Sequence, residues 1–68
     1  MKKTFTVTGM SCQHCSGRVK AALESLPGVK SAEVNLKKQT ATVKSDAEVA
    51  DSVLKAAVTD AGYEAIFD

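Results

Sequence analysis

The chain has 68 residues, of which 44% are hydrophobic and 25% charged, with two cysteines and a net charge of +1. This length allows a single domain, residues 1–68, of ordinary globular composition. A nearly neutral chain with 4% aromatic residues argues against nucleic-acid binding. No apolar run is long enough to predict a signal peptide or a transmembrane helix, which favours the cytoplasm, where thiols stay reduced.

The first strand and helix follow from the spacing of apolar residues. Residues 4–8, TFTVT, alternate polar and apolar side chains, which predicts a half-buried strand. From about Gln13 to Leu26 the apolar residues recur at helical spacing, and Pro27 with Gly28 ends the helix. The buried stripe of this helix is expected to comprise Val19, Ala22, Leu23 and Leu26.

Two further alternating segments predict a hairpin. Residues 32–36, AEVNL, and 40–44, TATVK, each place apolar side chains on one face. The polar residues 37–39, KKQ, lie between them as a turn.

The last part of the chain predicts a helix and a strand. Ser45 and Glu48 have capping-box spacing, which suggests that the helix starts there, and Gly62 suits its C-terminus. A strand over 63–67 completes the order β-α-β-β-α-β. This order is typical of an α+β, ferredoxin-like sandwich with two helices on one face of a four-stranded antiparallel sheet. The buried face of the second helix is expected to comprise Val49, Ala50, Val53, Leu54, Ala57, Val58 and Ala61.

The candidate functional residues are Cys12 and Cys15, in the motif GMSCQHC at 9–15. The pair lies between the first strand and the first helix, with Cys15 at or just inside the helix start. Free amide groups and the positive end of the helix dipole favour a thiolate there. Arg18 and Lys20, one turn on, are expected to add to this effect and to lower a thiol pKa.

Three chemistries suit such a pair. A thiol–disulfide redox module uses C-x-x-C at a helix start, but this chain is short, its strand order differs, and Pro27 serves the end of the helix. Structural zinc needs four ligands, and the sequence offers only Cys12, Cys15 and His14. A two-thiolate site for a soft monovalent ion such as Cu(I) needs nothing more. Its open side would let a partner thiolate take the metal by ligand exchange.

The same residues resemble a known family. The motif at 9–15, together with GV at 28–29, V-x-L at 34–36 and AGY at 61–63, is similar to the heavy-metal-associated domain family over essentially the whole chain. Within that family, the chain resembles bacterial cytosolic copper chaperones. The resemblance implies a non-enzymatic carrier that delivers Cu(I) to copper-transporting P-type ATPases and, in some members, to a copper-responsive repressor.

The resemblance also implies roles for individual residues. Cys12 and Cys15 would be the metal ligands, Met10 a core plug beneath the loop, and Tyr63 a residue approaching the site from the last loop. His14 is either exposed loop filler or a residue that tunes thiol acidity or bridges a dimer. An acid before the first cysteine is common in zinc and cadmium members, and Ser11 stands there instead, which favours copper.

Several features remain open at this level. Zn(II), Cd(II), Ag(I) and Hg(II) are further candidates for binding in vitro. The apo-protein is expected to be monomeric, with a copper-bridged dimer at higher loading. The alternative is a metal-binding domain excised from a copper-transporting ATPase or a mercuric reductase. The basic residues of 1–44, eight Lys and Arg against two Glu, are either solvated surface or a face for an acidic partner.

Overall fold

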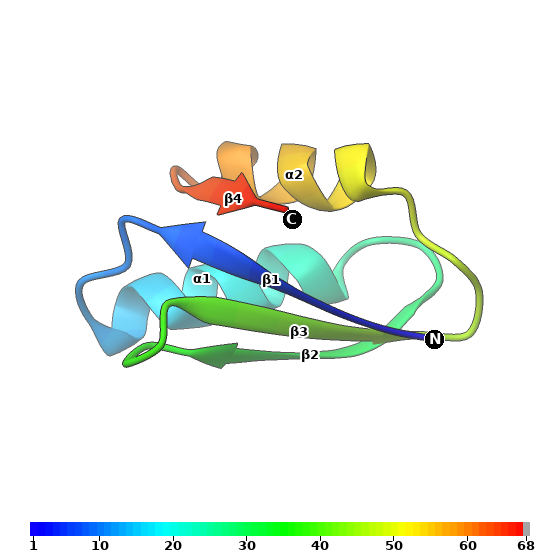
Figure 1. Ribbon diagram of the computed structural model, residues 1–68, viewed down its shortest axis with the longest axis horizontal. Coiled ribbons are helices and arrows are strands. Elements are labelled where there is room, and N and C mark those ends of the chain that lie inside the picture. Colours follow the sequence, from blue (N-terminus) through cyan, green and yellow to red (C-terminus); the bar gives the residue numbers. More distant parts are fainter. Residues whose placement is uncertain (68) are drawn as a thin grey trace.

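The computed structural model describes residues 1–67, which form six elements in the order β-α-β-β-α-β (Figure 1). They are β1 (Lys2–Thr8), α1 (Gln13–Glu24), β2 (Val29–Asn35), β3 (Thr40–Ser45), α2 (Asp51–Asp60) and β4 (Glu64–Ile66). The four strands form one antiparallel sheet in the order β2-β3-β1-β4. The ferredoxin-like sandwich predicted from the element order is therefore confirmed.

One face of the sheet is buried by both helices, which lie on the same side of it in Figure 1. The alternation in β1 turns Phe5 and Val7 into the core and leaves Thr4, Thr6 and Thr8 more exposed. Met10, in the loop before α1, is also part of the core at 5% exposure. Every element contributes to one cluster, which comprises Phe5, Val7, Met10, Val19, Leu23, Ala32, Ala41, Val43, Leu54, Ala57, Val58 and Ala65.

Element boundaries differ from expectation by a few residues at several ends. The β2–β3 hairpin is present, but β2 starts at Val29 and its register shifts between Val29 and Ser31. Helix α1 ends at Glu24 and not at Leu26, because the residue before a proline disfavours helical backbone angles. Strand β4 is shorter than expected and covers Glu64–Ile66 only.

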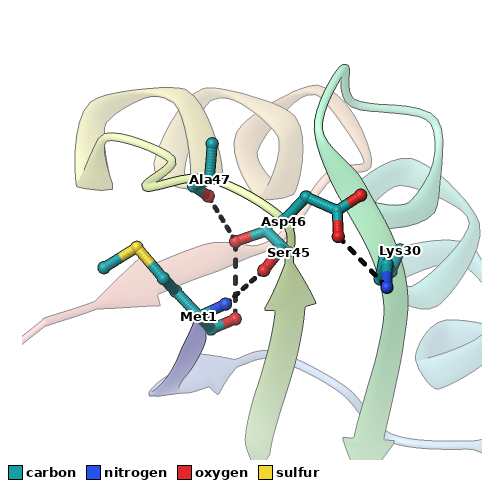
Figure 2. Close-up of polar contacts among 5 residues, drawn as sticks. All are labelled: Met1, Lys30, Ser45, Asp46 and Ala47. Atoms are coloured by element: carbon teal, nitrogen blue, oxygen red, sulfur yellow. Dashed lines mark hydrogen bonds and ion pairs between the residues drawn. The ribbon is translucent and has the colours of Figure 1, made fainter.

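The predicted start of the second helix at Ser45 is wrong. Ser45 is the last residue of β3, and α2 begins at Asp51. The Ser45 hydroxyl donates to the carbonyl of Ala47 at 2.6 Å and lies 3.4 Å from that of Met1 (Figure 2). With its side chain taken by these carbonyls, Ser45 does not cap the helix, and the serine–glutamate spacing to Glu48 is incidental.

The later helix start changes the buried face of α2. Leu54, Ala57 and Val58 are buried as expected, Val49 and Ala61 are half-buried, and Ala50 and Val53 are exposed. Val49 and Ala50 precede the helix, and Val53, 41% exposed, lies beside the stripe that faces the sheet. Gly62 follows the helix at a φ of +98°, which agrees with its predicted place after the C-terminus.

The connections divide between two ends of the molecule. The β1–α1, β2–β3 and α2–β4 connections gather at the left of Figure 1, and Met1 lies at the other end with the α1–β2 and β3–α2 connections. At this end, backbone hydrogen bonds connect Met1 with Ser45, and an ion pair of 3.1 Å connects Lys30 with Asp46 (Figure 2). Neither helix within residues 1–67 is long and apolar enough to cross a membrane.

Candidate metal site

A short loop carries the two cysteines from the end of β1 into α1. Gly9 turns the chain at a φ of +91°, a conformation that suits glycine, and Met10 enters the core immediately after it. Cys12 is then the N-cap of α1, and Cys15 is the third residue of the helix. The cysteine spacing therefore places both sulfurs at the first turn of α1, as the sequence predicted.

The two thiols are free, close together and open to solvent. Their sulfur atoms lie 3.5 Å apart, well beyond the disulfide bond length of about 2.05 Å. Cys12 is exposed and Cys15 is partly exposed. The Cys12 carbonyl accepts the amides of Cys15 and Ser16, but the Cys12 side chain makes no cap bond. Both sulfurs are therefore available to an incoming ligand.

Hydrogen bonds from neighbouring groups lower the pKa of the Cys15 thiol from 9.0 to about 6. The Tyr63 hydroxyl has the largest effect, followed by the backbone amide of Ser11 and the thiol of Cys12. Each of these groups stabilises the thiolate by donating to it. The low pKa agrees with the sequence prediction, and the backbone amide of Ser11 agrees with the expected effect of free amide groups. The expected contribution of Arg18 and Lys20 is not among the causes.

Tyr63 reaches the site from the connection between α2 and β4. Its hydroxyl donates to Cys15, which raises the pKa of Tyr63 because the phenol is then favoured over the phenolate. Its ring lies close to Gly9, where an added Cβ atom would be 3.6 Å from the ring carbon Cδ1. Tyr63 is partly buried and packs against the core. It therefore combines core packing with a hydrogen bond to the thiol.

Gln39, in the β2–β3 turn, was missed by the sequence analysis, which assigned it only to a polar turn. Its side-chain nitrogen donates to the Met10 carbonyl at 2.8 Å and to the Leu36 carbonyl at 2.7 Å. Twenty-nine residues separate Gln39 from Met10, so no local pattern marks the contact. The turn thereby supports the loop that carries the cysteines.

The remaining polar residues near the thiols are exposed. His14, Arg18 and Lys20 lie on the solvent side of α1, and His14 is not among the groups that shift the pKa of Cys15. The Ser11 hydroxyl lies 3.9 Å from the Cys15 sulfur. Within residues 1–67, no three His, Cys, Asp or Glu side chains gather in a way that could hold a metal ion. The two thiols are therefore the soft donors that the described residues offer at this loop.

The fold and the open thiol pair define a class of small ferredoxin-like domains, and comparison with known proteins places the chain in it. The heavy-metal-associated domain matches residues 4–64. The chain therefore belongs to the heavy-metal-associated domain family.

Similar proteins cover nearly the whole chain. The copper chaperone CopZ of Enterococcus hirae is 44% identical over 66 residues, which are 96% of each chain. A solved structure of a CopZ metallochaperone is 40% identical, with a TM-score of 0.90 over 97% of this chain and all of that one. A copper-binding domain from HMA7, a P-type ATPase, is 41% identical, with a TM-score of 0.89 over 96% of this chain and 89% of that one.

Proposed function

We propose that this chain is a copper chaperone that carries Cu(I) on the thiolates of Cys12 and Cys15. The carrying observation is the pair of free sulfurs, 3.5 Å apart and open to solvent, in a chain 44% identical to a copper chaperone along nearly its whole length. Thiolates are the ligands that Cu(I) prefers. In this proposal residues 1–68 act as one domain in the cytoplasm, with no catalysis of their own.

Transfer would proceed by exchange of sulfur ligands. Cu(I) held by two sulfurs keeps an open side, and the exposed Cys12 lies at the rim of the loop. A thiolate of the partner adds to the ion as a third ligand, one chaperone sulfur leaves, and a second partner thiolate then displaces the other. The ion stays Cu(I) throughout. Met10, at 5% exposure, stays in the core as a plug and takes no part as a ligand.

The proposed partner is the metal-binding domain of a copper-transporting P-type ATPase. Arg18 and Lys20 are exposed on α1, within two turns of the thiols, and would orient the loop toward an acidic face. A copper-responsive repressor is a second candidate partner. The proposed apo state is a monomer, and the open side of the copper site would allow a copper-bridged dimer when copper is in excess.

An excised domain is the alternative, and the 41% identity to a copper-binding domain of a P-type ATPase favours it. The thiol pair would bind the same ion in that case, but transfer would be intramolecular. The full reading frame of the gene distinguishes the two. A redox module is the more remote alternative, and it requires turnover with a dithiol or disulfide substrate.

Native mass spectrometry after anaerobic loading tests the proposal. Cu(I), Zn(II) and Hg(II) are offered in competition with glutathione, and Cd(II) and Ag(I) in separate samples. We expect one Cu(I) per monomer at low loading, lost in Cys12→Ser and Cys15→Ser, because one thiolate cannot hold the ion against glutathione. Ser16→Ala, in the same helical turn, is the control and should bind normally. Copper retained by both cysteine variants would refute the assignment.

A further inference from the structure

Gln39 adopts a backbone conformation that its residue type does not favour. Its φ is +55°, and it is the one non-glycine residue with positive φ among residues 1–67. The left-handed region favours glycine, and a side chain with a Cβ atom is strained there.

Three hydrogen bonds join Gln39 to its surroundings. Its carbonyl accepts the amide of Val7 at 2.7 Å and so continues the pairing of β1 with β3. Its side-chain nitrogen uses its two hydrogens on the carbonyls of Leu36 and Met10. The first of these contacts closes the turn on itself. The second reaches across to the cysteine loop and is the only one of the three that bears on the metal site.

The Met10 carbonyl and the Ser11 amide belong to the same peptide group. A peptide group is planar and trans, so its carbonyl and its amide point in opposite directions. Holding the carbonyl therefore fixes the direction of the amide. The next residue, Ser11, has its hydroxyl 3.9 Å from the sulfur of Cys15, and Cys12 follows Ser11 directly in the chain.

We propose that Gln39 is a positioning residue of the metal site: its side-chain amide holds the Met10 carbonyl and thereby fixes the peptide group that leads through Ser11 into Cys12. The loop is then ordered before the metal arrives, so binding costs less conformational entropy. The effect on metal affinity rests on the proposed function, whereas the effect on the apo loop does not.

Two variants separate this role from a purely structural one. Gln39→Gly removes the side chain but relieves the left-handed strain, so its stability should equal or exceed that of the wild type. Gln39→Met keeps the length and the strain but has no donor. Lys38→Gly, at the neighbouring exposed turn position, is the matched control.

The first measurement uses apo-protein and needs no copper. Nitrogen-15 relaxation and amide hydrogen exchange should show greater mobility for residues 10–12 in both Gln39 variants, and no change there in Lys38→Gly. In Gln39→Gly the loop should therefore become more mobile while the free energy of unfolding does not fall. A purely structural role of Gln39 would lower both together. Wild-type order of residues 10–12 in Gln39→Gly would overturn the proposal, and this variant decides even if Gln39→Met fails to fold.

The second measurement is the Cu(I) dissociation constant, from competition with a chromophoric copper chelator. Loss of one hydrogen bond that preorders the loop should raise it by about threefold to tenfold in Gln39→Gly. An unchanged constant despite a mobile loop would overturn the role in metal binding. If the wild-type protein itself binds no Cu(I), the proposed function fails, and the apo measurement still decides whether Gln39 orders the loop.

Discussion

The two helices begin in contrasting ways. Neither has a side-chain cap, since Cys12 and Ala50 occupy the N-cap positions and make no side-chain hydrogen bond to the first turn. At α2 the positive helix end is met by Asp51, which also pairs with Lys3 at 2.8 Å. At α1 no acidic residue lies in the first turn. The positive end of the α2 dipole therefore acts on the Asp51 carboxylate, whereas that of α1 acts on the thiols. We infer that the lack of an acidic residue in the first turn of α1 belongs to the design of the thiol site.

The largest expected effect concerns the apolar residue that precedes each helix. Met10→Ala should lower the free energy of unfolding by about 2–5 kcal/mol, because Met10 is 5% exposed in the core. Val49→Ala, before α2, removes a half-buried side chain and should cost less. Urea unfolding of both variants tests this. Equal losses would show that the two helix starts depend on their anchors alike.

The second effect concerns the hydrogen bond from Tyr63 to the thiol. Tyr63→Phe keeps the ring but removes the largest cause of the lowered pKa of Cys15, so the pKa should rise from about 6 toward 9.0. Alkylation of Cys15 at a pH below 6, measured in a Cys12→Ser background, should become roughly tenfold slower for each unit by which the pKa rises, because the thiolate is the minor form there. Phe67→Leu, another partly buried aromatic position, is the control. An unchanged rate profile would show that the Tyr63 hydroxyl does not lower the pKa of Cys15.

The lowered pKa of Cys15 determines how the free energy of unfolding changes with pH. Because the Cys15 pKa is lower in the folded protein than its ordinary value of 9.0, the thiolate favours the folded state. This contribution is fully present above pH 9.0 and is lost as the pH falls through about 6. Thermal unfolding of wild type and Cys15→Ser across that range should show the difference between them shrinking toward acid pH.

The third effect follows from two substitutions that exchange the charges at the two helix starts. Gln13→Glu places a carboxylate at the first residue of α1, which should stabilise the helix by about 0.3–1 kcal/mol. The same carboxylate should raise the pKa of Cys15 and weaken Cu(I) binding through like-charge repulsion. Asp51→Asn should destabilise the protein by a similar amount and leave the thiols unchanged. Tighter copper binding in Gln13→Glu would contradict the contrast between the two helix starts.

The smallest effect concerns docking, where α1 is expected to differ from α2. Lys20→Glu should slow copper transfer to an ATPase domain at low salt and less so at high salt, because rim charges act on association. Lys55→Glu makes the same change in net charge on α2 and should leave the rate nearer to that of wild type. Stopped-flow transfer at two salt concentrations compares them. Equal slowing by both would reduce Lys20 to ordinary solvated surface.

Sequence reasoning succeeded where the structure follows from a local period. The alternation in β1 and the helical stripe with Val19 and Leu23 predicted the buried faces, and the cysteine spacing placed both sulfurs at a helix start. It failed where a residue serves a distant partner. Ser45 has the spacing of a cap, yet its hydroxyl is taken by backbone carbonyls. The contact of Gln39 with the loop joins chain segments that only the tertiary fold brings together. The approach of Tyr63 to the thiols was predicted, but from the family resemblance and not from a local period.

The direction of β4 bears on how the domain could be built into longer proteins. Thr8 pairs with Glu64 and Thr6 with Ile66, so β4 starts beside the cysteine loop and runs away from it. Met1 lies at the far end, bonded to Ser45. Chain joined to Met1 would therefore leave from the end of the molecule opposite the loop that carries the sulfurs (Figure 1). A further domain, or a membrane enzyme, joined to Met1 would leave the thiols accessible to a partner.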